Sequence, residues 1–382
     1  MIIAVNLLAI NKDIGGAYNY IDNLLAGLNN LDKPHRIKVF HTENNLELVE
    51  KYNNLELVLC KVYTIKRLAR ILYENTILPL LLKTHKVDIV LWPSDTMGFI
   101  KTRTSIVISH DFLPLINPKA FGFFRRVYLR FALKFAIRNA DYFFFISITT
   151  QKELLQIQSD YDINKSKVLP NIINGAFRKL NAEELKAIKI DFELPSEFFL
   201  YVAHCYPHKN HIRLIRSFAK YRDESKVKNI EYIKLVLRGD GIQENEEIIK
   251  IIQEYELWND VIFVPRLSQL ALIKLYNLSS ALVFPSMYEG GGIPIMEAFA
   301  CGCFIIASEI EAVKEFTGGI FLGFDPYSEE SITTSLLEFS NKKFALNELL
   351  VKAQKITQRQ RDYVVIKQFY DSVSFLQNKR NL

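Results

Sequence analysis

Two glutamates flank a glycine-rich segment within residues 285–302, and residues of these types can bind a ligand that carries hydroxyl and phosphate groups. Three consecutive glycines, Gly290–Gly292, free the backbone to approach such a ligand closely. Glu289 and Glu297 lie on either side of them, and a carboxylate accepts hydrogen bonds from the hydroxyls of a sugar or a ribose. This segment is therefore the first candidate for a binding site.

A buried strand and a helix are expected to position the segment. The apolar run Ala281–Phe284 indicates a strand, Pro294 suits the first turn of a helix, and Ile295–Ala300 continues that helix. We expect Glu289 at the strand end and Glu297 in the first helical turn. The positive helix N-terminus would then point at the glycines and favour an anion such as phosphate. A simple strand-to-helix turn with a capping and a solvated glutamate explains each element alone, but not all of them in this order.

The order of these residues resembles a known family signature. Residues 289–302 follow the pattern Glu-Gly-x-Gly-x-Pro-x-x-Glu-Ala-x-Ala-x-Gly, which is similar to that of retaining GT-B glycosyltransferases of family 4. The resemblance implies an α/β fold of the GT-B type, with two Rossmann-like domains facing across a cleft. It implies that Glu289 contacts the donor sugar in catalysis and that Glu297 binds the nucleotide ribose. The neighbouring residues expected to contact the donor are Gly290, Gly291, Gly292 and Ile293.

The N-terminus carries a second glycine-containing loop. Ile2–Leu8 indicates a buried strand, the polar loop that follows ends at Gly15 and Gly16, and Ala17–Leu28 has helical spacing. Strand, glycine loop and helix form the first unit of a nucleotide-binding fold, although the loop lacks the Gly-x-Gly-x-x-Gly pattern of dinucleotide sites. The resemblance implies that the two glycines let the donor phosphate and the acceptor approach the backbone. The alternative is an ordinary helix N-terminal turn.

A histidine follows one of the alternating strands of the N-terminal half. Strand and helix patterns alternate from residue 37 onward, which predicts a parallel sheet with helices on both faces. The strand Ser105–Ser109 ends at His110, and ligands of open α/β sheets bind at the carboxyl ends of strands. A histidine there can donate a hydrogen bond to a sugar hydroxyl or a phosphate, although a lone histidine is usually structural. The resemblance places His110 in the donor-sugar pocket, as a catalytic residue.

The second half departs from the family at one donor-binding position. The strand Phe198–Ala203 leads into a loop in which the family carries an Arg and a Lys that clamp the donor diphosphate. Lys209 occupies the Lys position, but His204 stands where the Arg is expected. A neutral histidine holds a diphosphate less strongly than a guanidinium, so either His204 is protonated or other groups replace it. The resemblance also implies that the backbone at Val264 contacts the base, where Pro265 removes one N–H donor.

A basic stripe marks the helix expected over Phe121–Arg138. Its cations recur every four residues, at Arg126, Arg130, Lys134 and Arg138. The apolar residues Phe123, Phe124, Val127, Phe131 and Phe135 lie on another face. Either this is the solvated face of an ordinary amphipathic helix, or it contacts anionic lipid head groups or a lipid diphosphate. Basic residues near an apolar stretch at residues 77–82 could join that surface, namely Lys66, Arg67 and Arg70.

Length and charge suggest two domains with different partners. A chain of 382 residues fits an N-terminal domain of residues 1–177, onto which a C-terminal helix of about 360–382 packs back, and a nucleotide-sugar-binding domain of residues 196–359. Residues 1–180 hold 24 Lys and Arg against 15 Asp and Glu, whereas the rest of the chain holds 24 against 27. The basic half suggests an anionic partner on that side.

The sequence offers few signs of a metal, a disulfide or a membrane span. The four cysteines have no metal-ligand spacing, and the apolar start Met1–Ile10 indicates a strand rather than a signal peptide. Asp160 and Asp162 superficially match an Asp-x-Asp metal motif, but they lie in a polar connection and are expected to form a loop. No run reaches the ~18 apolar residues of a membrane helix. We therefore expect a cytoplasmic protein that works peripherally at the inner face of the plasma membrane.

The resemblance favours a metal-independent hexosyltransferase without a cofactor. It implies a nucleotide sugar as donor, GDP-mannose by preference, and a lipid-linked glycan of a bacterial surface polysaccharide such as O-antigen as acceptor, without a nucleic acid partner. No carboxylate is clearly placed as a nucleophile, which favours front-face attack by the acceptor hydroxyl. A UDP-hexose-specific transferase and a non-catalytic sugar-nucleotide-binding protein remain alternatives. An epimerase or oxidoreductase is disfavoured, because its Tyr-x-x-x-Lys pair occurs only in unsuitable places, at Tyr161/Lys165 and Tyr363/Lys367.

Overall fold

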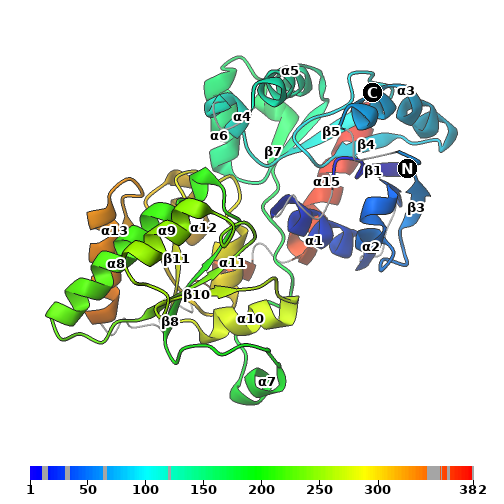
Figure 1. Ribbon diagram of the computed structural model, residues 1–382. Coiled ribbons are helices and arrows are strands. Elements are labelled where there is room, and N and C mark those ends of the chain that lie inside the picture. Colours follow the sequence, from blue (N-terminus) through cyan, green and yellow to red (C-terminus); the bar gives the residue numbers. More distant parts are fainter. Residues whose placement is uncertain are drawn as a thin grey trace. The chain divides into compact units, whose positions relative to one another are not determined.

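The chain divides into two compact units. The computed structural model describes residues 1–10, 16–30, 35–62, 67–118, 122–341, 353, 355–358 and 362–380. Unit 1 comprises Met1–Ile172 with Gln360–Leu382, and unit 2 comprises Ile173–Arg359 (Figure 1). The stretch 178–195, expected to link two domains, lies within unit 2 and contains the short helix α7 (Ala182–Ala187).

Unit 1 contains a seven-stranded sheet in the order β3-β2-β1-β4-β5-β6-β7. All of its strand pairs are parallel. The central strands are almost continuous runs of buried apolar residues, as expected for a sheet covered on both faces. The strands are β1 (Ile2–Asn6), β2 (Arg36–His41), β3 (Glu56–Leu59), β4 (Ile89–Trp92), β5 (Thr104–Ser109), β6 (Tyr142–Phe145) and β7 (Ser166–Val168).

Helices connect the strands of unit 1, and the last helix of the chain returns to it. That helix, α15, packs against α1 so closely that a side chain at Gly27 would overlap the Ile366 side chain. Phe369 of α15 also contacts Phe144, with ring centroids 5.6 Å apart. The helices of this unit are α1 (Gly16–Asn30), α2 (Leu46–Val49), α3 (Arg67–Thr84), α4 (Leu113–Ile116), α5 (Phe123–Asn139), α6 (Ile148–Ile157) and α15 (Asp362–Arg380), with 3-10 turns η2 (Glu43–Asn45) and η4 (Ile163–Lys165).

Unit 2 contains a six-stranded parallel sheet in the order β10-β9-β8-β11-β12-β13. The strands are β8 (Phe198–Val202), β9 (Lys234–Arg238), β10 (Val261–Val264), β11 (Ala281–Phe284), β12 (Phe304–Ser308) and β13 (Leu322–Phe324). Besides α7, the helical segments are η5 (Pro207–Lys209), α8 (His211–Val227), α9 (Glu246–Glu254), α10 (Gln269–Leu278), α11 (Ile293–Ala300), α12 (Glu311–Thr317) and α13 (Glu329–Asn341).

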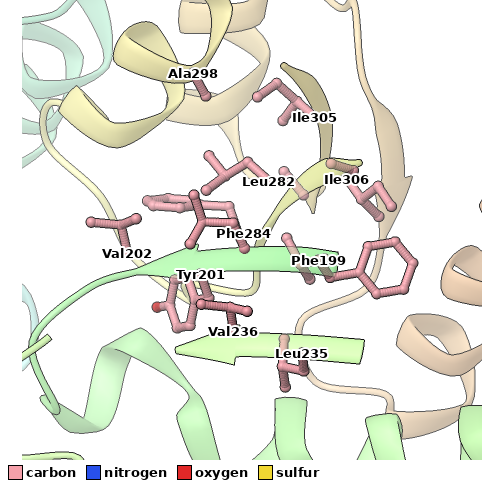
Figure 2. Packing of buried hydrophobic residues seen from close by; sticks show 14 of the residues in the cluster. Phe199, Tyr201, Val202, Leu235, Val236, Leu282, Phe284, Ala298, Ile305 and Ile306 are labelled. Atoms are coloured by element: carbon pink, nitrogen blue, oxygen red, sulfur yellow. The ribbon is translucent and has the colours of Figure 1, made fainter. Parts of the chain in front are cut away.

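The core of unit 2 forms where these strands meet their helices. Figure 2 shows Phe199 and Tyr201 of β8 beside Leu282 and Phe284 of β11, with Ala298 of α11 above them. Each of these side chains is fully buried. Burial of apolar surface contributes about 25 cal/mol per Å² to the free energy of folding. The shared core therefore holds β8 and β11 side by side. The loops that leave their carboxyl ends are thereby fixed as well.

Both sheets have the same topology and the same switch point. The strand order reverses between β1 and β4 in unit 1, and between β8 and β11 in unit 2. Ligands of doubly wound sheets bind at the carboxyl ends of the strands on either side of this reversal. The prediction of two Rossmann-like α/β units is confirmed, and the cleft between them stays a prediction.

Candidate donor-binding site

The glycine loop between β11 and α11 has a backbone that requires glycine at its last position. Gly292 caps α11 in the left-handed region, with φ +51°, and a Cβ there would overlap the ring of Phe316. The helix begins at Ile293, with Pro294 in its first turn. Glu297 is the fifth residue of the helix and lies in its second turn. Its predicted place in the first turn is wrong because the helix begins one residue before Pro294.

Glu297 is a buried carboxyl group with one side-chain donor. Its side chain is held inside unit 2, where the Tyr276 hydroxyl of α10 donates a 3.0 Å hydrogen bond to Oε2. Burial raises the pKa of Glu297 to about 7, against the opposing effects of Tyr276 and Arg238. A carboxyl group with this pKa changes its charge near neutral pH, so its capacity to accept hydrogen bonds from hydroxyls depends on pH.

Glu289 forms an ion pair that links two loops. The Lys209 Nζ of η5 lies 2.5 Å from Oε1 of Glu289, and both side chains are largely buried. The Met287 N–H also donates to the carbonyl oxygen of His208, at 2.8 Å. These contacts join the loop after β8 to the loop after β11. The structure thus brings Lys209, Glu289 and the glycine loop together at the switch point of unit 2.

His204 is neutral in this environment. Burial lowers its pKa, and the cations Arg238, Arg266 and Lys209 lower it further, whereas Asp240 raises it. Nδ1 of His204 lies 3.4 Å from Oδ2 of Asp240, which keeps the ring oriented. Of the two possibilities left open by the sequence, replacement of the missing arginine by other groups is therefore favoured over protonation of His204.

Two arginines that the sequence analysis did not assign lie at neighbouring strand ends. Arg238 is the last residue of β9, and Arg266 follows β10. Both act electrostatically on His204, and Arg238 also acts on Glu297. Nε of Arg238 is buried and has no hydrogen-bond partner within the described parts of the chain. The signal in the sequence was their position at the ends of buried strands, where ligands of open α/β sheets bind.

Gly239 shows why that turn is restricted. A side chain at this position would overlap the carbonyl oxygen of Ala203, so the backbone after β9 passes directly over the backbone after β8. Arg238 and His204 are brought close by this contact. Val264, the remaining predicted donor contact, is the buried last residue of β10 and precedes Pro265.

In unit 1, His110 follows β5 as predicted. Its Nε2 donates a hydrogen bond within the unit, which leaves Nδ1 as an acceptor. Nε2 lies 3.0 Å from the carbonyl oxygen of Pro93, and a carbonyl only accepts, so Nε2 carries the proton. Burial lowers the pKa of His110 and keeps the ring neutral. Nδ1 is then an acceptor. The neutral ring thus offers Nδ1 to a ligand as an acceptor, and its contact with a ligand stays a prediction.

Asp95 supports His110 and was missed from the sequence. It follows β4 with φ +63°, a conformation that non-glycine residues rarely adopt. Its Oδ1 accepts the backbone N–H of His110 at 2.5 Å. Burial raises the pKa of Asp95 to about 6, against the hydrogen bonds donated by the backbone of His110 and Asp111. A rare backbone conformation and a buried carboxyl group thus occur together at the switch point of unit 1, a combination that is common at functional sites.

The glycines at the N-terminus of α1 are only partly described. Gly15 lies outside the described residues. Gly16 is the exposed first residue of α1, and a Cβ there would meet nothing within 4 Å. Close approach of a ligand to the backbone at Gly16 stays a prediction.

Asp160 and Asp162 lie in the connection after α6, as expected. Asp162 caps the 3-10 turn η4 and accepts the backbone N–H of Asn164. Among the described residues, no group of three or more His, Cys, Asp or Glu side chains could hold a metal ion.

The basic helix α5 turns its phenylalanines outward. Its buried face consists of the smaller set Ala132, Leu133, Ala136 and Ile137. Phe124 is 88% exposed, and Phe123, Val127 and Phe131 are exposed as well. The helix therefore presents apolar and basic side chains together to solvent, which an ordinary amphipathic helix does not do.

Two Rossmann-like units, each with polar and charged residues at the strand ends of its switch point, define an α/β protein of the doubly wound class. Residues 183–359 match the family model described as glycosyl transferases group 1. This match over the second half of the chain confirms the resemblance seen in residues 289–302.

Two relatives with curated descriptions are mannosyltransferases. The serotype-specific mannosyltransferase WbdA of Escherichia coli is 28% identical over 261 residues, which are 66% of this chain and 31% of that protein. The O-antigen chain mannosyltransferase RfbU of Salmonella typhimurium is 28% identical over 254 residues, 66% of this chain and 65% of that protein. The match to WbdA thus spans less than a third of that relative.

Solved structures of low sequence identity share the fold. The crystal structure of Anabaena HepE in complex with UDP-glucose has a TM-score of 0.76 at 18% identity, covering 98% of this chain and 99% of that chain. WaaG, described as a glycosyltransferase involved in lipopolysaccharide biosynthesis, has a TM-score of 0.70 at 14% identity, covering 97% and 99%. The GT-B fold class predicted from the sequence is thereby supported over nearly the whole chain.

Proposed function

We propose that this protein transfers a hexose from a nucleoside-diphosphate sugar to a hydroxyl group of a glycan acceptor, with retention of the anomeric configuration. The observation that carries the proposal is the arrangement at the switch point of unit 2. There the Lys209–Glu289 pair joins the loops that follow β8 and β11, and the buried Glu297 lies in α11, directly after the second of these loops. Cations for a diphosphate and carboxylates for hydroxyls thus occur in one place.

Each group has a proposed role in binding the donor. Glu297 accepts hydrogen bonds from the ribose, and Glu289 accepts them from the donor sugar. Lys209, Arg238 and Arg266 neutralise the diphosphate, which replaces the cation that His204 does not supply. His110 of unit 1 is proposed to line the pocket of the donor sugar, with Nδ1 as the acceptor.

The proposed reaction is a front-face displacement. The acceptor oxygen forms a bond to the anomeric carbon while the bond from that carbon to the diphosphate oxygen breaks, and the electron pair leaves with the diphosphate. The proton of the acceptor hydroxyl passes to the departing oxygen on the same face. The three cations stabilise the charge that develops on the leaving group, and the proposal includes neither a metal ion nor another cofactor.

The proposed donor is GDP-mannose. WbdA and RfbU, which are both described as mannosyltransferases, support this choice at 28% identity. A UDP-hexose is the competing donor, since HepE was solved with UDP-glucose, although the 18% identity of that chain supports the fold alone.

We also propose that α3 and α5 dock unit 1 onto an anionic membrane that carries the lipid-linked acceptor. No described helix is long and apolar enough to cross a membrane. Exposed apolar side chains occur on both helices, however, at Leu68, Leu72 and Leu80 of α3 and at Phe123, Phe124, Val127 and Phe131 of α5. Helix α5 contains no acidic residue. Apolar insertion together with cations is the pattern of an interfacial helix.

The two helices form one surface because a loop bridges them. Oδ1 of Asn75 on α3 accepts the backbone N–H groups of Phe99 and Ile100. The Phe99 ring in turn packs on Phe131 and Phe135 of α5, with centroids 5.3 and 5.0 Å apart. Ile100 adds a further exposed apolar side chain between them.

The proposed activity is tested by release of nucleoside diphosphate from purified protein. GDP-mannose, UDP-glucose, UDP-galactose and UDP-N-acetylglucosamine are supplied in turn, with and without a membrane extract as acceptor. We expect GDP release from GDP-mannose that increases with the acceptor and is lost in Glu289→Gln. Binding of GDP-mannose without any turnover would instead favour a sugar-nucleotide-binding protein.

A further inference from the structure

Unit 1 contains a polar cluster at its switch point that the donor site does not use. Asn6 is the buried last residue of β1, and its Nδ2 donates to Oε1 of Glu74 on α3 at 3.2 Å. Nη1 of Arg70, one helical turn earlier, lies 3.8 Å from the same oxygen. Tyr128 of α5 interacts electrostatically with both Arg70 and Glu74. Three elements thus place an amide, a carboxylate, a guanidinium and a phenol together.

The hydrogen-bonding capacity of this cluster is largely unused. A separation of 3.8 Å is too long for a hydrogen bond, so Arg70 makes none within the described part of the chain, although its side chain is only 17% exposed. No side-chain atom of Arg70, Glu74 or Tyr128 is both buried and without a partner in the described parts of the chain, so atoms without a partner reach solvent. Burial raises the pKa of Glu74, against the effects of Arg70 and Asn6. Polar atoms that reach solvent are open to a ligand.

A second observation at the same place comes from the other strand of the switch point. Trp92 ends β4, is 5% exposed, and its Nε1 has no hydrogen-bond partner among the described residues. A Cβ on Gly98 would lie 3.1 Å from both the Trp92 ring and the carbonyl oxygen of Glu74. The indole and the polar cluster therefore share one neighbourhood at the carboxyl edge of the sheet, where open α/β sheets bind ligands.

A purely structural role explains the cluster less well. A strut that ties α3 to β1 needs only the bond from Asn6 to Glu74. It does not need a mostly buried arginine without a hydrogen bond, or an open phenol from a third element. A ligand with hydroxyl groups would supply partners to Arg70 and Tyr128 in addition to the bond from Asn6.

We propose that Arg70, Glu74 and Tyr128 bind hydroxyl groups of the acceptor sugar, an inference that rests on the proposed transferase function. The opposite charges of Arg70 and Glu74 nearly cancel, which suits a neutral polyol. A free phosphate or a lipid diphosphate would meet the Glu74 carboxylate and be repelled. The carboxylate accepts from hydroxyls, the guanidinium donates to them, and the phenol does both.

The position of the cluster fits an acceptor that is carried by a lipid. Arg70 and Glu74 belong to α3 and Tyr128 to α5, the two helices whose exposed apolar residues form the proposed membrane-docking surface. The same helices would therefore hold the lipid side of the acceptor outside and its sugar at the sheet edge.

The test measures direct binding of neutral sugar probes to the full chain. Ligand-observed NMR gives dissociation constants for the octyl glycosides of mannose, glucose, galactose and N-acetylglucosamine, and for GDP. The variants are Glu74→Gln, which keeps an acceptor for Asn6, and Tyr128→Phe, with Glu50→Gln on the exposed surface as the control. Because binding is measured without turnover, the result does not depend on whether the donor reaction is found.

We expect at least one glycoside to bind wild type, with Glu74→Gln and Tyr128→Phe weakening it about tenfold or more while GDP affinity stays within about twofold. Glycoside affinity of wild type should fall as pH drops through the raised pKa of Glu74, and Glu74→Gln should abolish that dependence. The proposal is overturned if no glycoside binds wild type, if both variants bind as wild type does, or if inorganic phosphate displaces the glycoside. Failure of the transferase proposal would appear separately, as absence of nucleoside diphosphate release from wild type.

Discussion

Lys209 and Glu289, whose charged atoms lie 2.5 Å apart, form an ion pair that joins the two loops leaving β8 and β11. The strands are held side by side by the core of unit 2, so the pair occurs where the order of the sheet reverses. It is largely shielded from water, and each charge depends on the other. A ligand that binds at this place meets a fixed cation and a fixed carboxylate instead of two mobile side chains.

Breaking this ion pair should lower the stability of unit 2 and weaken donor binding. Lys209→Met leaves the Glu289 carboxylate buried without its partner, a change that costs about 3–5 kcal/mol when one member of a buried pair is removed. The double variant Lys209→Met/Glu289→Gln should recover most of that stability, because no charge is left unpaired. Urea denaturation measures this, with Lys228→Met at the exposed pair to Glu224 as the control. Equal losses in the single and double variants would contradict a coupled pair.

Glu297 should give the protein a stability that decreases with rising pH. Burial raises its pKa to about 7, above the ~4.3 of an unfolded glutamate, so the folded chain keeps a proton that the unfolded chain releases. The resulting stabilisation is present below about pH 4 and is lost as pH rises through about 7, by up to about 4 kcal/mol. Glu297→Gln, which mimics the protonated form, should lack this component. Urea midpoints of both proteins from about pH 5 to pH 8 test the idea, and parallel curves would refute it.

The same residue should matter for the donor. Loss of a charged hydrogen bond costs ~1.5–3 kcal/mol, so Glu297→Ala should weaken binding of GDP-mannose by about tenfold or more. Calorimetric titration measures the affinity, and Glu311→Ala at an exposed position of α12 serves as the control. An affinity within about twofold of wild type would remove the ribose assignment.

Binding of the donor diphosphate should depend on the arginines and not on His204. Because His204 is neutral, His204→Ala should change GDP affinity by less than about threefold, whereas Arg266→Ala should reduce it by about tenfold, as expected for a charged hydrogen bond. The affinity for GDP should also show no step attributable to His204 near pH 6. A large loss in His204→Ala together with such a step would mean that the histidine is charged when the diphosphate is bound.

The membrane proposal predicts salt-sensitive binding to anionic vesicles. Each cation near an anionic bilayer contributes about 1 kcal/mol, screened within a Debye length of about 8–10 Å. The Arg126/Arg130/Lys134 triple-glutamate variant should therefore lose most of its binding to phosphatidylglycerol vesicles at low salt. The matched control reverses three exposed lysines elsewhere in unit 1, at Lys152, Lys165 and Lys167, and should bind as wild type does.

An apolar variant separates insertion from charge alone. Phe124→Ser/Phe131→Ser keeps every cation but removes two exposed phenylalanines. At high salt, where the charges are screened, this variant should therefore lose vesicle binding before wild type does. Equal sedimentation of wild type, the charge variant and the control would show that α5 is only a solvated face.

Much of the fold could be predicted from the sequence because periodicity carries it. Ala281–Phe284 was predicted with the bounds that the structure shows and Ser105–Ser109 with bounds within one residue, since short apolar runs between turns indicate buried strands. The short strand β13 was not predicted, because Leu322–Phe324 has too few residues for a pattern. Helix starts were predicted less accurately. Helix α11 begins one residue before Pro294, which places Glu297 in the second turn rather than the first.

The candidate site was only partly predictable. Motif residues such as Glu289 and Lys209 were found because their types and spacing are distinctive. Arg238 and Tyr276 were not, since their importance arises from contacts between elements distant in sequence, as does the orientation of His110 toward Pro93. The exposure of Phe124 could not be predicted either, because a phenylalanine at helical spacing is usually buried.

The most direct test of the central claim is the configuration of the product. Wild-type protein is incubated with GDP-mannose and the acceptor in the presence of EDTA, and the anomeric configuration of the transferred sugar is determined by NMR. Retaining, metal-independent transfer predicts an α-mannoside together with stoichiometric GDP. A β-mannoside, or activity that EDTA abolishes and manganese restores, would contradict the account.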